Sequence, residues 1–292
     1  MHESMLAFRH RRYLWVAIII TAASIAAYLI HDPQEPPNGG TLLGYILGTL
    51  GALLIVWLTW YGVRKRRYDS TSGTVQGWLS AHVYLGLTVP IIALLHAGFQ
   101  LGFNIHTLAF VLLMLVVLSG MYGVFIYLKY PQRVSENRDG ASRPELFAQL
   151  EDIDSRSSRA AADLPAAFAA LVQSGASRTQ LGSTLWSRLR GADNSTIALP
   201  DQGQASTVSN AGQEAALDWL ADEQSRATDA DQAAKIGELS ALLRNKRKLL
   251  RQIREDLRLQ AAMELWLYFH VPLTAGLLVA LSAHIITVFL YW

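Results

Sequence analysis

The chain has 292 residues, of which 51% are hydrophobic and only 16% are charged, and its formal net charge is +2. So small a net charge gives no reason to expect a nucleic-acid partner. The sequence contains no cysteine, which excludes disulfide bonds and iron–sulfur ligation by this chain.

Five segments are long enough to cross the hydrocarbon core of a membrane, which takes about 20 helical residues. None of them contains Asp, Glu, Lys or Arg. They cover residues 13–30, 41–63, 77–99, 104–128 and 266–290. We therefore expect an all-α integral membrane protein, a bundle of five transmembrane helices. The first segment is too long for a cleavable signal peptide and lacks a cleavage site, so we interpret it as an uncleaved span.

Basic residues predict the orientation of the spans, because cytoplasmic loops are enriched in Lys and Arg. Such residues precede the first span, follow the second span at 64–67 and approach the fifth span at 244–258. The loop at 31–40 contains no Lys or Arg, and the turn at 100–104 is uncharged. The pattern predicts a cytoplasmic N-terminus and a periplasmic C-terminus in a bacterial inner membrane, with membrane lipid as a partner.

Composition divides the chain into three parts, with a cytoplasmic and mostly helical insertion between the fourth and fifth spans. The parts are spans one to four in 1–130, the insertion in 131–262 and span five in 263–292. The insertion contains no phosphate loop, dinucleotide fingerprint or catalytic triad. We expect no nicotinamide or flavin domain there.

Local patterns predict several elements inside the insertion. Helical pieces are expected at 144–153, 164–172, 215–220 and 228–262. The stretch 191–213 is rich in Gly, Ser, Asn and Gln and predicts a loop.

Hydrophobic residues recur at heptad a and d spacing along 228–262. They are Ile236, Leu239, Leu243, Leu250, Ile253 and Leu257. One interpretation is packing inside a small helical domain. The other is a docking surface for a partner subunit, which predicts that Leu243 and Leu250 contact the partner. The basic residues from Arg244 to Arg258, Lys246 among them, predict a solvated face or contacts with anionic lipid headgroups.

The third and fifth spans carry the same signature. Trp78, His82 and His96 follow one another at the same spacing as Trp266, His270 and His284. The two histidines of each span are 14 residues apart, which is about 21 Å along a helix and two heptads, so both face one neighbour.

Both spans are odd-numbered and therefore run parallel. His82 then matches His270 in depth near the inner face, and His96 matches His284 near the outer face. Four histidines in two matched pairs are what two stacked haems need for axial ligation, and ionisable residues inside a span usually mark function. Without cysteine, the haems would be non-covalent.

Two other interpretations of these histidines remain. They can be interior side chains that bond to neighbouring helices. They can also belong to a metal transporter, although transporters usually place acidic or sulfur ligands in their spans, and these spans have none.

The paired histidines on two parallel spans resemble those of the di-haem b-type cytochromes. These include the cytochrome b of quinol-oxidising respiratory complexes and the transmembrane domain of ferric reductases and NADPH oxidases. The resemblance implies that His82, His96, His270 and His284 ligate two non-covalent haems b. Unlike the oxidases, this chain has a large polar insertion before span five and no flavin or NADPH domain.

Further residues are candidates for holding the haems. Gly86 and Gly276 lie between the histidines of their spans, where a porphyrin or a neighbouring helix can approach closely. Candidates for the inner propionates are Arg64, Arg66, Arg67 and Lys129, and candidates on the outer side are Gln100, Asn104, His31 and His106. His31 and His106 are also candidates to accept a proton from a quinol, or they are simple interfacial histidines.

The sequence therefore predicts an electron-transfer subunit of an oxidoreductase complex. It would carry electrons across the membrane between a quinone pool or periplasmic cytochrome and a partner redox subunit. A self-contained ferric-reductase-like enzyme and a non-redox membrane scaffold are the alternatives.

Overall fold

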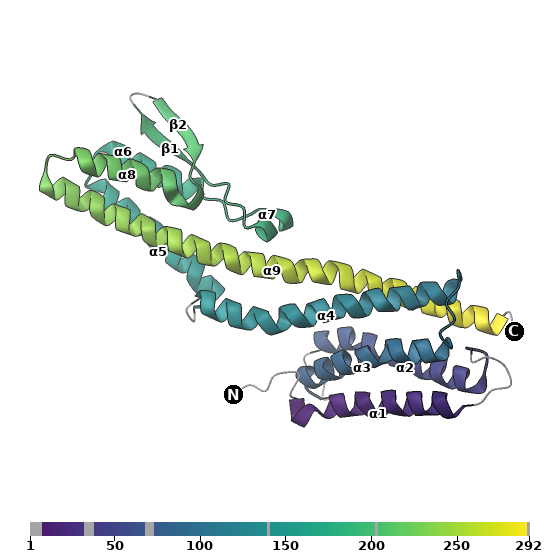
Figure 1. Cartoon of the computed structure of the whole chain (residues 1–292). Coiled ribbons are helices and arrows are strands. Elements are labelled where there is room, and N and C mark those ends of the chain that lie inside the picture. Colours follow the sequence, from purple (N-terminus) through teal and green to yellow (C-terminus); the bar gives the residue numbers. More distant parts are fainter. Residues whose placement is uncertain (1–7, 32–37, 68–72, 139–140, 202–203, 291–292) are drawn as a thin grey trace. The chain divides into compact units, whose positions relative to one another are not determined.

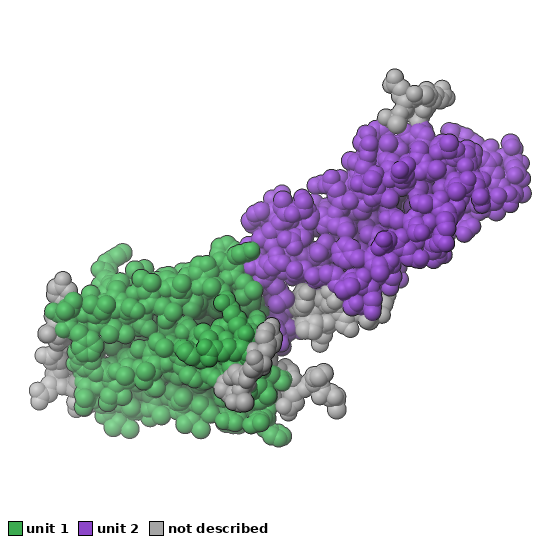
Figure 2. All heavy atoms as spheres, turned by 180° about the vertical axis from the view of Figure 1, so that it is seen from behind, with its two compact units in different colours: residues 1–125, 266–292 green, residues 126–265 purple. Residues whose placement is uncertain are grey.

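A computed structural model describes residues 8–31, 38–67, 73–138, 141–201 and 204–290. Contacts between residues divide the chain into two compact units, coloured separately in Figure 2. Unit 1 contains residues 1–125 and 266–292, and unit 2 contains residues 126–265.

Unit 1 is a helical bundle (Figure 1). Its helices are α1 (Phe8–Ile30), α2 (Leu42–Arg66), α3 (Val75–His96), the first part of α4 (Ile105–Arg138) and the last part of α9 (Ala230–Leu290). Each of these five helices has a stretch that is long and apolar enough to cross a membrane. The predicted all-α fold with five spans and a mostly helical insertion is confirmed.

Threonine side chains set where two of these helices begin. Thr41 accepts a hydrogen bond from the Gly44 N–H at the start of α2, and Thr74 accepts one from the Gly77 N–H at the start of α3. Such caps satisfy backbone donors that have no partner inside the helix.

The core of unit 1 draws apolar side chains from all five helices. The buried members are Ala17, Ile55, Leu58, Ala81, Leu85, Val89, Leu113 and Leu277. Large apolar side chains elsewhere on the same helices remain exposed, with exposed fractions of 60% for Trp15 and 70% for Val279. An apolar outer surface of this kind suits contact with lipid.

Unit 2 combines helices with one β-hairpin. Its elements are the last part of α4, α5 (Arg143–Ala162), α6 (Ala166–Ser177), α7 (Leu185–Arg190), β1 (Thr196–Asp201), β2 (Gln204–Ser209), the 3₁₀ turn η1 (Ala211–Gln213), α8 (Glu214–Arg226) and the first part of α9. The helical pieces expected at 144–153 and 215–220 lie within α5 and α8. Those expected at 164–172 and 228–262 match α6 and α9 except for their first two residues.

The hairpin corrects the prediction of a loop over 191–213. Strands β1 and β2 pair antiparallel, with Ile197 opposite Val208. Ile197 is 1% exposed and joins the core that α6, α8 and α9 form. Ile197 and Leu199 on β1 and Val208 on β2 face this core, and the polar residues between them obscure the alternation in the sequence.

The apolar stripe of α9 is the core of unit 2. Leu239, Leu243 and Leu250 are 0%, 5% and 1% exposed. Leu239 and Leu243 pack in one cluster with residues of α6 and α8, so the interpretation as internal packing is correct. The prediction that Leu243 and Leu250 form a docking surface is wrong, because these side chains are already covered by the chain itself.

One basic residue of α9 departs from the predicted solvated face. The Lys246 side chain is 2% exposed, and its Nζ lies 2.6 Å from Asp154 Oδ1 on α5. A buried ammonium group needs such a partner because desolvation alone is costly. Lys246 therefore joins α9 to α5 rather than facing solvent.

Candidate functional site

The structure brings the outer pair of histidines together. His96 ends α3, His284 lies on α9, and their ring centres are 6.0 Å apart with planes at 75°. Two imidazoles on opposite sides of one metal ion have ring centres about 6 Å apart, because each metal–nitrogen bond is about 2 Å. The spacing of the His96 and His284 ring centres is therefore compatible with two imidazoles that share one metal ion.

The other two histidines are also neighbours. His82 lies near enough to His270 to influence it electrostatically, and His96 and His106 lie near enough to His284 to do the same. Each of these histidines of α9 thus has a histidine of α3 in its neighbourhood, and the pairing by depth stays a prediction.

Backbone carbonyls define the tautomers of both α3 histidines. His82 Nδ1 lies 3.0 Å from the Leu58 carbonyl oxygen, and His96 Nδ1 lies 2.7 Å from the Gly44 carbonyl oxygen, both on α2. A carbonyl oxygen only accepts, so each Nδ1 must donate its proton. In the neutral rings Nε2 then carries the lone pair, which is the arrangement typical of a metal-ligating histidine.

Ser119 on α4 plays the same part for His270. Its hydroxyl lies 2.7 Å from His270 Nδ1 and donates its own proton to the Val116 carbonyl at 2.9 Å. With that proton used, the hydroxyl accepts from Nδ1–H and again leaves the lone pair on Nε2. The fourth ring differs, since His284 Nδ1 is buried and has no hydrogen-bond partner in the described part of the chain.

Glycines in and just before α2 make room for the His96 ring, and Gly120 on α4 lies in ordinary contact with the His270 ring. A Cβ added at Gly48 would lie 2.7 Å from His96 Cε1, and one added at Gly39 would lie 3.1 Å from the same atom. At Gly120 a Cβ would lie 3.5 Å from His270 Cε1. The His96 ring therefore fits against α2 only because Gly48 has no side chain.

The two glycines singled out from the sequence have a different surrounding. A Cβ added at Gly86 or Gly276 would meet no described atom within 4 Å. Neither glycine is thus in tight contact with a neighbouring helix. Open space beside the backbone between the histidine levels leaves room for a planar group.

Buried apolar side chains also lie between the two levels. Val89 lies halfway between His82 and His96, Leu277 lies halfway between His270 and His284, and they are 0% and 3% exposed. Both belong to the core cluster of unit 1.

Aromatic residues border the inner level. The Tyr61 ring centre is 5.2 Å from that of His82, and the Trp266 ring centre is 5.4 Å from that of His270. Trp266 also donates its indole N–H to the Ser119 carbonyl oxygen at 2.8 Å. Trp78, its counterpart by spacing, instead stacks on Trp57 with ring centres 4.9 Å apart.

The basic candidates at the inner end are placed differently from one another. The Arg64 side chain is buried, and it donates to the carbonyl oxygens of Arg67 at 2.9 Å and Gly73 at 2.5 Å. It therefore holds the connection between α2 and α3. Arg66 and Arg67 are exposed. The side chain of Lys129 lies outside the described part of the chain.

At the outer end, one further histidine joins the pair. The ring centre of His106 on α4 is 4.4 Å from that of His284. His31 Nε2 is buried and has no hydrogen-bond partner among the described residues. Asn104 is used locally, because its side-chain oxygen accepts from the Thr107 N–H at 3.0 Å. Gln100 is exposed.

Ser119, Gly48 and Tyr61 were not predicted from the sequence. Ser119 and His270 are 151 residues apart in the chain, and no local pattern connects them. Gly48 lies one helical turn after Gly44, so a pair of glycines at that spacing on α2 was the available signal for close approach.

Among the described residues, no three or more His, Asp or Glu side chains lie together in a group that could hold a metal ion without other ligands. Histidine pairs suit a metal whose remaining ligands come from elsewhere, as in a porphyrin. No protein-family model matches the chain, and it has no significant similarity to a curated protein or a solved structure.

Proposed function

We propose that this protein is a di-haem b-type cytochrome in which His82 and His270 hold one haem and His96 and His284 hold the other. The single observation that carries the proposal is the outer pair: two imidazoles on different helices with ring centres 6.0 Å apart, one of them fixed through Nδ1 by the Gly44 carbonyl. Haem b supplies one-electron redox chemistry when it is bound.

The residues of the chain have three tasks in this proposal. Leu58, Gly44 and Ser119 orient the imidazoles and keep the lone pair on Nε2. Val89 and Leu277 exclude water between the two levels. Open space at Gly86 and Gly276 admits the flat macrocycle.

Two haems at two depths would let the protein carry electrons across the membrane. With the orientation that the basic residues predict, the inner level would face a partner redox subunit in the cytoplasm. The outer level would face a quinone pool or a periplasmic carrier. His106, whose ring lies beside that of His284, and His31, whose Nε2 has no partner among the described residues, would then be the candidates to bond a propionate or a quinol. The charge-free spans offer no acidic or basic proton relay, so proton pumping is not part of the proposal.

The test is the haem content of the full chain purified in a mild detergent. We expect two haems per chain, both extractable by acid acetone, and a low-spin b-type reduced-minus-oxidised spectrum. A preparation that remains haem-free after expression with sufficient haem supply would contradict the proposal and favour a membrane scaffold.

A further inference from the structure

Unit 2 contains a cavity of about 300 Å³ whose walls are dominated by arginine. The arginines that line it are Arg190, Arg247, Arg251, Arg254 and Arg258. All of them belong to residues 126–265, so the cavity is formed within unit 2 alone. Its size is near the lower end for small-molecule sites in proteins.

One face of α9 supplies four of these arginines. Arg247, Arg251, Arg254 and Arg258 recur at intervals of four, three and four residues, so they share one side of the helix. The row is about 16 Å long at 1.5 Å per residue. Arg190 joins it from the end of α7, where Gly191 turns the chain with φ of 62°.

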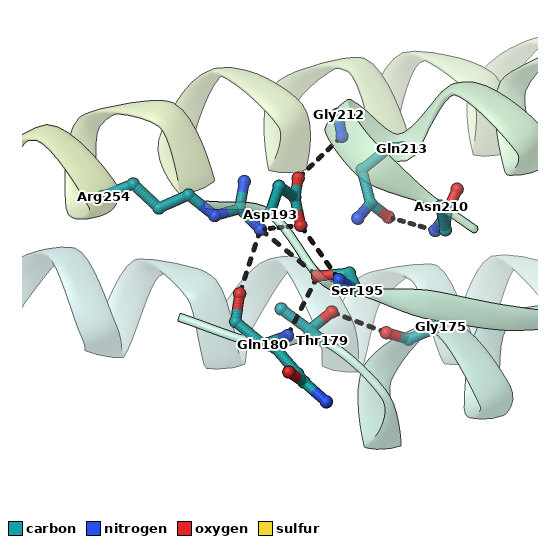
Figure 3. Close-up of polar contacts among 9 residues, drawn as sticks. All are labelled: Gly175, Thr179, Gln180, Asp193, Ser195, Asn210, Gly212, Gln213 and Arg254. Carbon is teal, nitrogen blue, oxygen red and sulfur yellow. Dashed lines mark hydrogen bonds and ion pairs between the residues drawn. The ribbon is translucent and has the colours of Figure 1, made fainter. Parts of the chain in front are cut away.

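Arg254 holds the loops of the cavity together (Figure 3). Its Nη2 donates to Asp193 Oδ1 at 2.7 Å, to the Gln180 carbonyl oxygen at 3.2 Å and to Ser195 Oγ at 3.2 Å. Asp193 also accepts from the N–H groups of Gly212 and Ser195, at 2.7 and 3.1 Å. Both carboxylate oxygens of Asp193 therefore accept hydrogen bonds from residues that surround the cavity.

Gly212 brings backbone close to the row of arginines. Its φ of 61° lies in the left-handed region, and a Cβ added there would be 3.7 Å from Nε and Nη2 of Arg247. The backbone turn at Gly212 therefore forms one side of the cavity. Asp193 holds this turn through the Gly212 N–H, and Arg247 packs against it.

The positive charge of the cavity is only partly balanced. Three arginines have carboxylate partners: Arg254 with Asp193, Arg247 with Glu214 at 3.1 Å, and Arg258 with Glu255 at 3.5 Å. Arg190 and Arg251 have no carboxylate partner among the described residues. Guanidinium groups crowded around one cavity repel one another unless an anion lies between them.

We propose that this arginine-lined cavity binds a phosphate group, either as a free phosphate or as the headgroup of an anionic lipid. The planar guanidinium fork matches phosphate oxygens bidentately, and arginine keeps its charge at any physiological pH. A bound phosphate would join α7 to α9 through Arg190 and Arg251. This site is independent of the histidine pairs, because none of its residues belongs to unit 1.

Calorimetric titration of the full chain in an uncharged detergent tests the site. One arm uses inorganic phosphate, and the other uses short-chain phosphatidic acid, with phosphatidylcholine of the same chain length as its reference. The variants are Arg190→Gln and Arg251→Gln, which break no ion pair with a described residue. Arg244→Gln is the matched control, since Arg244 is an exposed arginine of α9 that does not line the cavity.

We expect wild-type protein to bind at least one of the two titrants, with affinity reduced about tenfold or more in Arg190→Gln and Arg251→Gln, as for lost charge-assisted hydrogen bonds. Arg244→Gln should stay within about twofold of wild type. Binding of inorganic phosphate identifies a soluble ligand, and binding of phosphatidic acid alone identifies a lipid. The proposal is overturned if neither titrant binds, or if Arg244→Gln weakens binding as much as Arg251→Gln does.

Discussion

At the scale of single residues, the histidine site depends on the hydrogen-bond partner of each Nδ1 atom. His82 and His96 donate to carbonyl oxygens of α2, and these bonds are part of the backbone. His270 depends on the Ser119 hydroxyl, which a single substitution removes. Partners of this kind fix the ring orientation and tautomer of metal-ligating histidines.

Ser119→Ala should weaken binding of the inner haem about 10–100-fold, the usual effect of losing such a partner. The measurement is haem content per chain together with the spectrum after dilution or detergent washing. Ser282→Ala is the control, because the Ser282 hydroxyl only donates to the Leu278 carbonyl oxygen on the same helix. Equal haem retention by both variants would argue against the role of Ser119.

Gly48→Ala should displace the His96 ring, because the new Cβ would lie 2.7 Å from its Cε1 atom. The outer haem should then be lost or become high-spin while the inner haem keeps its spectrum. Gly62→Ala, on the same helix, meets nothing within 4 Å and should retain both haems. A normal outer haem in Gly48→Ala would show that His96 does not need this position.

At the scale of the elements, the sequence predicted the five spans well. A long apolar segment without charges forms a membrane-spanning helix whatever it packs against, so the prediction did not depend on tertiary contacts. The spacing of the histidines likewise predicted that the rings of His96 and His284 come together. It could not predict the partners of Nδ1, because Ser119 and the α2 carbonyls reach the rings only through the packing of helices.

The helix α9 shows where a periodic pattern is ambiguous. A heptad stripe has the same spacing whether it packs against its own chain or against another. Only the contacts of Leu243 with α6 and α8 residues decide for internal packing. The β-hairpin was missed because Ile197 is the one fully buried hydrophobic residue among the described residues of a polar stretch.

Leu243→Ala should destabilise unit 2 by about 2–5 kcal/mol, as expected for truncating a buried leucine. The measurement is chemical unfolding of the full chain, followed by the circular dichroism signal and by proteolysis within 141–201. Arg244→Ala changes the exposed neighbour and should stay within about 0.5 kcal/mol of wild type. If Leu243→Ala unfolds like wild type but loses a bound partner, the docking interpretation would be restored.

At the scale of the whole molecule, the orientation in the membrane follows from charge alone and has its own test. The chain contains no cysteine, so single cysteines can be introduced without background. Ser225 is exposed in unit 2, and Leu101, between α3 and α4, is 56% exposed. The two variants are Ser225→Cys and Leu101→Cys. An impermeant thiol reagent applied to spheroplasts should label Leu101→Cys and not Ser225→Cys. The reverse pattern would invert the topology.

The most direct measurement of the central claim is the haem content and spectrum of the four single variants His82→Ala, His270→Ala, His96→Ala and His284→Ala. Because the proposal pairs the histidines by depth, the first two variants should lose the same haem and the last two should lose the other. His10→Ala, an exposed histidine outside both levels, should keep two haems. The account would be contradicted if His82→Ala lost the same haem as His284→Ala, or if all four variants kept the wild-type spectrum.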